Sequence, residues 1–375
     1  MTIHGPGYSD TTFSLHFTDL EDPRRSSKGN FIYPLEEILF LSISASICGC
    51  KEWTSIEEFG NLKLEWLQQF YPYKNGVPSH DSLGKLFASL DQKRFNGCFT
   101  KWVNSIAKNH KSDVIPIDGK TIRGVASKHG KAPLHIVTAF CSKNSVSLGQ
   151  QIVDDKSNEI VAIPKLLDSI VIKGCIITID AMGCQKKIAE KISEKEADYI
   201  LQVKGNQKKL SEEIIRHFET GKQKQDHVSL DSGHGRIEVR RCEIISDLSN
   251  FEGKENWKNL NSVIRIESVR TEKSTDYTSE GFRYYISSLQ TNAELINNSI
   301  RNHWSIENKL HWSLDVIFNE DGQLKRNGNS ATNYNTIAKA AIALLDNEKS
   351  QKKSKPLKML KATLSDKYRE KIMKV

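Results

Sequence analysis

The stretch Ile176-Ile177-Thr178-Ile179-Asp180-Ala181 is an apolar, β-branched run that ends in a carboxylate. β-Branched residues favour strands, and a strand that is apolar throughout is typically buried on both faces. Helical patterns flank this run at residues 159–170 and 185–195, and a further strand pattern covers residues 199–203. This alternation of strand and helix predicts an α/β core.

Three β-rich runs, at residues 114–117, 135–140 and 148–153, precede this unit. The resulting order of three strands, helix, strand, helix, strand is typical of an α/β core with a mixed sheet. The first run ends in Asp118, as the later one ends in Asp180. Because open α/β sheets place their ligands at the carboxyl ends of strands, we expect both carboxylates at that edge. The alternative is structural: an Asp-Gly turn at Asp118, and a helix cap at Asp180.

A third carboxylate lies in the helical pattern of residues 293–318. Within it His303, Glu307, His311 and Asp315 recur at every fourth position, which places them on one face of an α-helix. Large apolar residues on the other faces predict that the helix is well buried, and buried ionisable groups require partners or a metal. The alternative is a solvated polar stripe.

Carboxylates from two strand ends and one helix would suit two divalent cations. Magnesium prefers oxygen ligands and keeps several waters, so Asp118, Asp180 and Glu307 together with a phosphate would complete its shell, and Mn²⁺ is the expected substitute. In such a pair one ion activates the attacking oxygen and the other stabilises the leaving oxygen. A zinc or iron site that uses His303 and His311 is the alternative.

The composition sets broad limits. The 375 residues carry a net charge of +8, which is compatible with a polyanionic partner without demonstrating one. Seven cysteines without paired spacing predict reduced thiols in a cytoplasmic protein. The start of the chain lacks a secretory signal, and the apolar run at residues 38–50 is too short for a bilayer, so we expect no membrane segment.

Changes of pattern along the chain predict its domain organisation. The expected segments are an N-terminal arm (1–30), a helical domain (31–112), the first part of the core (113–227), a β-rich insertion (228–290), the rest of the core with the Glu307 helix (291–347) and a basic C-terminal tail (348–375).

Several segments between about residues 30 and 345 resemble the insertion-sequence transposases of the ISAs type, which include the H-repeat-associated proteins. They are Tyr33-Pro34-Leu35-Glu36-Glu37-Ile38-Leu39, Pro78-Ser79-His80-Asp81-Ser82, Ile117-Asp118-Gly119-Lys120-Thr121-Ile122-Arg123, Thr178-Ile179-Asp180-Ala181-Met182-Gly183-Cys184-Gln185, Val203-Lys204-Gly205-Asn206-Gln207, and Arg301-Asn302-His303-Trp304 through Asp315-Val316. The Asp180 and Glu307 strings are highly specific in combination.

The resemblance implies a DDE triad of Asp118, Asp180 and Glu307 in a ribonuclease-H-like core, and DNA end cleavage and strand transfer with two Mg²⁺ ions. It implies that the β-rich stretch is an insertion and that the front helical domain helps to bind the terminal inverted repeats. The implied partners are double-stranded DNA, both element ends and target, and a second copy of the chain in a homodimer on DNA. The implied location is the bacterial cytoplasm, at the nucleoid during activity.

One part of the wider superfamily's pattern differs here. The superfamily carries Tyr and Arg before the catalytic Glu and a Lys after it, whereas Ile300, His303 and Leu314 occupy those spacings in this chain. Candidates for the missing phosphate contacts are Arg301, His303 and Lys309. The candidates for DNA binding in general are Lys120, Arg123, Lys204, Asn206, Arg301, His303, Lys309 and His311. If Glu307 is not the third carboxylate, the alternatives are Asp315, Glu320 and Asp321.

Two other functions remain open from the sequence. One is a degenerate or domesticated element protein that binds DNA without cutting it. The other is a stand-alone nuclease on a ribonuclease-H-like core, which would hydrolyse DNA but never join strands.

Overall fold

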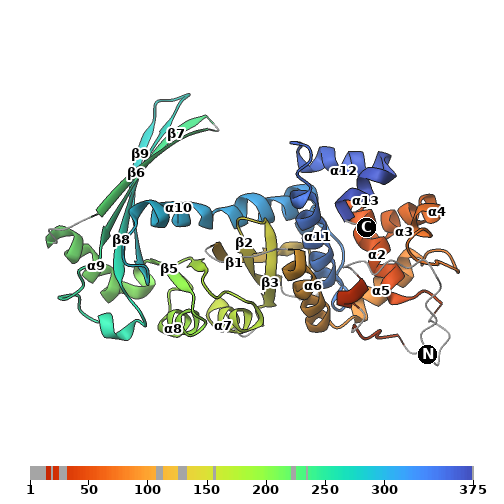
Figure 1. Cartoon of the computed structure of the whole chain (residues 1–375), viewed down its shortest axis with the longest axis horizontal. Helices are drawn as coiled ribbons and strands as arrows, with labels where there is room; N and C mark the ends of the chain where they lie inside the picture. The colour runs from red at the N-terminus through yellow and green to blue at the C-terminus, as the bar shows by residue number, and fades with distance from the viewer. Residues whose placement is uncertain are drawn as a thin grey trace.

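The computed structural model describes residues 14–17, 20–24, 32–106, 113–125, 133–154, 158–220, 225–233 and 235–373. The molecule is elongated, with helices at one end, an α/β core in the middle and long β-hairpins at the other end (Figure 1). A single nine-stranded sheet runs through the core and the hairpins in the order β3-β2-β1-β4-β5-β9-β8-β7-β6.

The first five strands form the core of the fold. They are β1 (Val114–Ile122), β2 (Leu134–Cys141), β3 (Val146–Ile152), β4 (Ile176–Ile179) and β5 (Asp198–Val203). The first three are antiparallel neighbours, and β4 and β5 run parallel to β1. Parallel neighbours need crossover connections, which α7 (Glu159–Ser169) and α8 (Lys186–Glu194) provide. This arrangement confirms the predicted α/β fold with a mixed sheet and a ribonuclease-H-like core.

The inserted strands extend this same sheet. After β5 the chain forms η3 (Gly205–Gln207) and α9 (Lys208–Thr220), a helix that the sequence analysis did not identify. Then follow β6 (Gln225–Gly233), β7 (Arg236–Ile245), the short η4 (Lys254–Asn256), β8 (Ser262–Glu272) and β9 (Thr278–Ser287). Because β9 pairs antiparallel with β5, the insertion is continuous with the core sheet.

Helix α10 (Ala293–His303) crosses one face of the sheet and contacts β1, β4, β6 and β7. Its Ile296 and Ile300 pack with Ile176 of β4 and Ile200 of β5 in a separate apolar cluster. The helix therefore carries the chain from the insertion back over the centre of the core.

The helical run continues past α10 as π-helix, in η5 (Ile306–His311) and η6 (Ser313–Ile317). The prediction of one α-helix to residue 318 is wrong for this part. The amide of Phe318 donates to the carbonyl of Ser313, five residues back. The hydroxyl of Ser313 donates to the Lys309 carbonyl, and it competes there with the α-helical bonding pattern.

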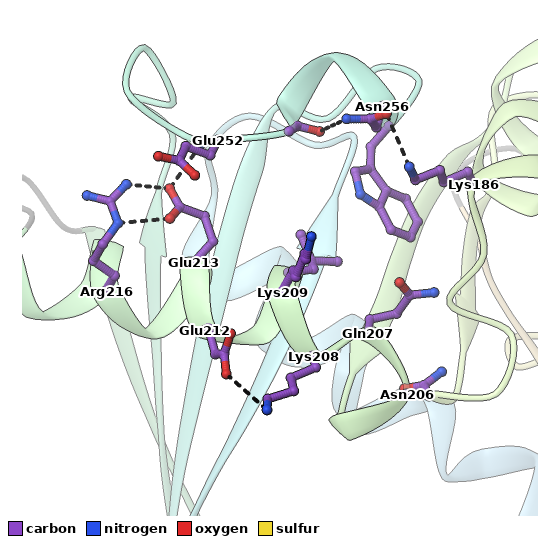
Figure 2. Close-up of a pocket in the computed structure, with 13 residues that line it drawn as sticks. Lys186, Asn206, Gln207, Lys208, Lys209, Glu212, Glu213, Arg216, Glu252 and Asn256 are labelled. Atoms are coloured by element: carbon purple, nitrogen blue, oxygen red, sulfur yellow. Dashed lines mark hydrogen bonds and ion pairs between the residues drawn. The ribbon is translucent and has the colours of Figure 1, made fainter.

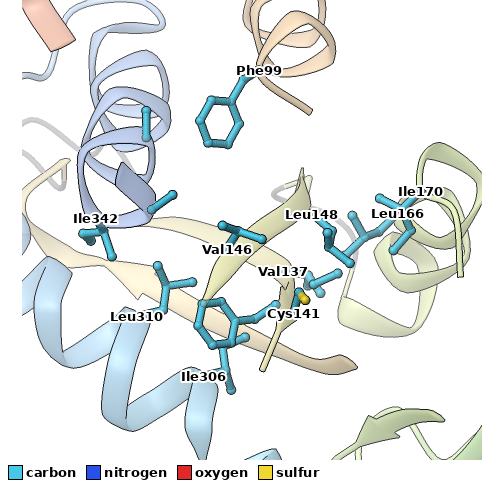
Figure 3. Close-up of a cluster of buried hydrophobic side chains, with 14 of the residues drawn as sticks. Phe99, Val137, Cys141, Val146, Leu148, Leu166, Ile170, Ile306, Leu310 and Ile342 are labelled. Atoms are coloured by element: carbon cyan, nitrogen blue, oxygen red, sulfur yellow. The ribbon is translucent and has the colours of Figure 1, made fainter. Parts of the chain in front are cut away.

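The end helices surround α11 (Ser330–Asn347), which packs against α2, α5, α6 and β3. The front helices are α1 (Ser14–Phe17), α2 (Leu35–Ile47), α3 (Trp53–Leu62), α4 (Leu64–Leu67), α5 (His80–Ser89) and α6 (Gln92–Ile106). Figure 3 shows apolar side chains that join α6, α11 and the π-helix to β2, β3 and α7. One apolar core thus holds the helices to the sheet. Among the helices of the described ranges, none has both the length and the apolar character needed to cross a bilayer.

Buried cationic side chains also connect the front helical region to later parts of the chain. Buried Lys325 donates to the Lys51 carbonyl at 2.5 Å, and its ammonium lies 4.2 Å from the centre of the Tyr334 ring. Arg369, which is fully buried, lies 3.9 Å above the ring of Trp66.

The region expected to be a basic tail forms α12 (Lys355–Leu364) and α13 (Asp366–Met373). Both helices pack on α11, and α13 also contacts α2. Of the expected N-terminal arm, the structure describes only residues 14–17 and 20–24, and the remainder lies outside the described residues.

Candidate active site

Asp118 and Asp180 occupy neighbouring positions on adjacent parallel strands. The last paired residues of β1 and β4 are Ile117 and Ile179, and each aspartate is the next residue along its strand. Asp180 follows the end of β4, as predicted, and its Oδ1 accepts bonds from the amides of Met182 and Gly183 at 3.1 and 3.4 Å.

The prediction that Asp118 closes its strand is wrong. Only the pairing with β4 ends there, because β1 remains paired with β2 as far as Ile122. Asp118 and Gly119 are therefore extended residues within β1 and do not form a turn. Asp118 therefore reaches the site from the middle of β1, which stays paired with β2 on the side opposite β4.

Glu307 approaches these aspartates from η5. One pocket of about 200 Å³ brings the three carboxylates together. It is lined by Asp118, Thr178, Ile179, Asp180, Ile200, Gln202, Lys204, Tyr285, Ile300, His303, Trp304 and Glu307.

The carboxylates of this pocket repel each other. Burial, together with the charges of Glu307 and Asp180, raises the pKa of Asp118 to about 7. Burial also raises the pKa of Glu307. Within the described ranges, no Lys or Arg forms an ion pair with any of the three. A bound cation would therefore neutralise the negative charge of these carboxylates.

The two histidines of the predicted stripe are uncharged neighbours of the site. His311 Nδ1 lies 3.6 Å from Asp118 Oδ2, but burial, aided by Lys339 and Lys120, lowers the pKa of His311 to about 3. His303 Nδ1 lies 3.0 Å from the Thr178 hydroxyl, and burial lowers the pKa of His303. Neither imidazole can therefore balance the charge of the carboxylates at neutral pH.

The oxygen-only carboxylate set fits a hard divalent cation better than zinc or iron. In the part of the chain that the structure describes, no three His, Cys, Asp or Glu side chains already stand close enough to hold an ion. An ion at this pocket would therefore have to draw the carboxylates closer together.

The alternative third carboxylates are already engaged. Lys120, whose side chain is 12% exposed, lies 2.7 Å from both Asp315 and Glu320. Asp321 accepts a bond from the backbone amide of Arg123 at 3.0 Å. Glu307 is the one acidic residue of the helical run that lines the pocket with Asp118 and Asp180.

Comparison with known proteins assigns this chain to a family. Residues 109–345 match the model described as "Transposase DDE domain", and residues 14–103 match the one described as "DDE_Tnp_1-associated". The chain belongs to the DDE transposase family. Domains of this family generally depend on divalent metal ions and act on DNA.

Relatives of this DDE family member cover nearly its whole length. It is 38% identical to "H repeat-associated putative transposase YhhI" of Escherichia coli strain K12, over 94% of this chain and 95% of the relative. It is 40% identical to "Putative transposase YncI" of Escherichia coli O157:H7, over 94% and 92%. It is 38% identical to "Putative protein YbfL" of strain K12, over 94% and 95%. The resemblance to H-repeat-associated proteins is thus confirmed.

Most of the predicted DNA-binding side chains of this DDE protein have partners within the fold. Asn206 donates to the Ala181 carbonyl at 2.6 Å, and Lys309 lies 3.3 Å from the Ser142 carbonyl. Arg301 pairs with Asp231 and Glu238, which connects α10 to the insertion. Lys204 is exposed and lines the carboxylate pocket.

A second, wider pocket, whose lining does not include the three carboxylates, lies between α8, α9 and the loop around η4 (Figure 2). Its basic side chains are largely paired within it. Arg216 bonds Glu213 at 2.5 Å, Lys208 lies 3.9 Å from Glu212, and Lys186 donates to Asn256. We assign no role to this pocket.

Two groups beside the triad were not predicted, namely buried Lys339 and the partly buried pair of His135 and Glu159. Lys339 donates to Thr138 at 2.9 Å and to Gln150 at 2.5 Å, and burial lowers its pKa to about 7. A lysine inside the run Ala338-Lys339-Ala340-Ala341 was the available sequence signal. His135 and Glu159 bond at 2.6 Å against Gly119, a contact that depends on long-range packing and leaves no local signal.

Proposed function

We propose that this protein is an active transposase that cuts and rejoins DNA by metal-dependent phosphoryl transfer, with Asp118, Asp180 and Glu307 as catalytic residues. One observation carries the proposal. Carboxylates from β1, from the end of β4 and from η5 line a single pocket, and no Lys or Arg of the described residues pairs with them. Family membership supports the same reading.

Asp118, Asp180 and Glu307 would hold two Mg²⁺ ions, for which Mn²⁺ could substitute. Bound there, the ions would activate the attacking water or 3′-hydroxyl and stabilise the leaving oxygen of the phosphodiester. The donor set is entirely oxygen, which suits this metal.

The other side chains have supporting roles in this proposal. The Met182 and Gly183 amides orient Asp180, and the uncharged His311 leaves Asp118 free to bind a cation. Lys204 is exposed at the rim of the pocket and would contact a phosphate of the bound strand. Arg123 is likewise exposed, whereas Lys120 stays with Asp315 and Glu320 and is no longer a candidate DNA contact.

The proposed substrate is double-stranded DNA: the terminal inverted repeats of the element and a target duplex. The helical domain at residues 31–112 would help to bind the ends, and two copies of the chain would bridge them. The proposed setting is the bacterial cytoplasm, at the nucleoid.

The test uses a labelled duplex that carries the DNA flanking the gene, with and without Mg²⁺. Wild type should nick the duplex only with the metal and then join the new 3′ end to a target plasmid. Asp118→Asn should bind the duplex but leave it uncut. Cleavage by purified Asp118→Asn would contradict the proposal. Binding without cleavage by wild type would favour a domesticated binding protein, and cleavage without joining would favour a stand-alone nuclease.

A further inference from the structure

A groove of about 1030 Å³ lies between the inserted strands and the helical run that follows α10. Trp304 and Glu307 line both this groove and the carboxylate pocket, so the two adjoin at these side chains. The groove is lined by Asp231, Ser232, Gly233, Arg236, Glu238, Arg240, Arg270, Arg283, Arg301, Trp304, Glu307, Asn308 and Trp312.

Strand alternation explains why arginines gather there. On β7, Ile244 and Cys242 belong to the apolar cluster under α10. Alternate residues of a strand share a face, so Arg240 and Arg236 continue that same face along the strand, where they line the groove. Neighbouring β8 and β9 add Arg270 and Arg283.

Not all of this positive charge is balanced inside the groove. Buried Glu238 pairs with Arg270 at 3.4 Å and with Arg301 at 3.3 Å, and Asp231 pairs with Arg301 at 2.5 Å. Arg236, Arg240 and Arg283 have no carboxylate partner among the residues that the structure describes. The groove therefore contains guanidinium groups without a carboxylate partner among the described residues, next to the acidic pocket.

Arg240 points most clearly to a missing anion. The residue is 3% exposed, yet its Nε and Nη2 have no hydrogen-bond partner within the described structure. Burial lowers its pKa. A buried guanidinium with two unpaired nitrogens is unfavourable, and a phosphate oxygen is an acceptor that fits its planar donors.

We propose that the groove is a phosphate-binding subsite, in which Arg240, flanked by Arg236 and Arg283, holds the backbone of the DNA strand that leaves the carboxylate pocket. The assignment of the ligand as DNA rests on the proposed function. The exposed faces of Trp304 and Trp312, 36% and 51% exposed, form an apolar wall beside the phosphates.

The test compares Arg240→Met with Arg241→Met. Arg241 is the adjacent residue of β7, is half-exposed on the opposite face and pairs with Asp226, so it gives the same charge change outside the groove. Binding of single-stranded and duplex oligonucleotides is measured without metal over a series of salt concentrations.

We expect Arg240→Met to weaken binding about tenfold, the value of one charge-assisted hydrogen-bonded contact. The slope of log K against log salt should fall by about one phosphate equivalent, and Arg241→Met should change neither quantity appreciably. The oligonucleotide for which Arg240→Met loses affinity, single-stranded or duplex, is the form of DNA that the subsite binds. Replacing single phosphates by neutral methylphosphonates should cost wild type affinity at one position and cost Arg240→Met nothing there.

A purely structural role for Arg240 gives the opposite result. Arg240→Met would then melt at a lower temperature than wild type without DNA and bind DNA unchanged, whereas we expect it to melt at the same temperature or higher. Equal loss of affinity in Arg240→Met and Arg241→Met would also overturn the subsite. If Arg240→Met does not fold, Arg283→Gln carries the same binding test.

These outcomes are separable from those of the proposed function. Metal-dependent nicking by wild type together with unchanged binding by Arg240→Met would reject only the subsite. Loss of binding in Arg240→Met together with cleavage by Asp118→Asn would reject only the proposed triad.

Discussion

Asp118→Asn should make the metal-free protein more stable at neutral and alkaline pH while it removes cleavage. Asp118 has a side chain that is 20% exposed and a pKa near 7 instead of the ordinary 3.8. Below about pH 4 the group is protonated in the folded and unfolded states, so it contributes no difference. Between about pH 4 and pH 7 only the unfolded state loses the proton, so the folded state loses stability as pH rises.

Above about pH 7 the full penalty applies. A pKa of about 7 against 3.8 corresponds to about 4 kcal/mol of lost stability. Asparagine has the same shape without the charge, so it removes this penalty.

Thermal unfolding in EDTA at pH 4 and pH 8 measures the effect. We expect Asp118→Asn to have the same melting temperature as wild type at pH 4 and a melting temperature several degrees higher than wild type at pH 8. Added Mg²⁺ should stabilise wild type at pH 8 and have little effect on the variant, because the cation replaces the missing counter-charge. Melting of Asp118→Asn at or below the wild-type temperature at pH 8 would refute this reasoning.

Three further outcomes test other parts of the structure. Glu307→Gln should lower the rate of nicking by at least about 100-fold, because it removes a proposed metal ligand. Asp315→Asn should lower this rate by less than about threefold, and equal losses in the two variants would place the third ligand elsewhere. Gly119→Ala adds a methyl group against the partly buried pair of His135 and Glu159 and should cost about 1–3 kcal/mol of unfolding free energy. Gly97→Ala, with open space around it on α6, should be neutral or stabilising, and equal melting temperatures of the two variants would show that Gly119 is not tightly packed. Lys325→Met removes the buried link to the α3 region and should cost about 2 kcal/mol in chemical unfolding, and an unchanged midpoint would show that this link contributes nothing.

The sequence predicted the core because its signals there are local. Residues 176–179 are β-branched throughout and are followed by Asp180, and the structure has β4 over the same residues. The position of Asp118 was harder to predict. Whether an Asp-Gly step turns or continues a strand depends on pairing with β2, which lies beyond the local sequence.

The three predicted carboxylates line one pocket, but the predicted geometry of the helical run was partly wrong. The spacing of four between His303, Glu307 and His311 assumed an α-helix, whereas the π-helix begins at Ile306. All three still face β1 and β4, because the apolar residues of the run fix which side is buried. The arginine groove had no comparable signal, since Arg240, Arg283 and Arg301 come from three separate elements that meet only in the folded chain.

Diffraction from crystals soaked in MnCl₂, recorded at an energy where manganese scatters anomalously, tests the central claim most directly. The account predicts anomalous peaks between the carboxylates of Asp118, Asp180 and Glu307, at about 2.1 Å from their oxygens. Anomalous peaks only at other acidic residues, such as Asp315 or Asp321, would contradict it. A crystal saturated with Mn²⁺ that shows no anomalous peak at this pocket would contradict it as well.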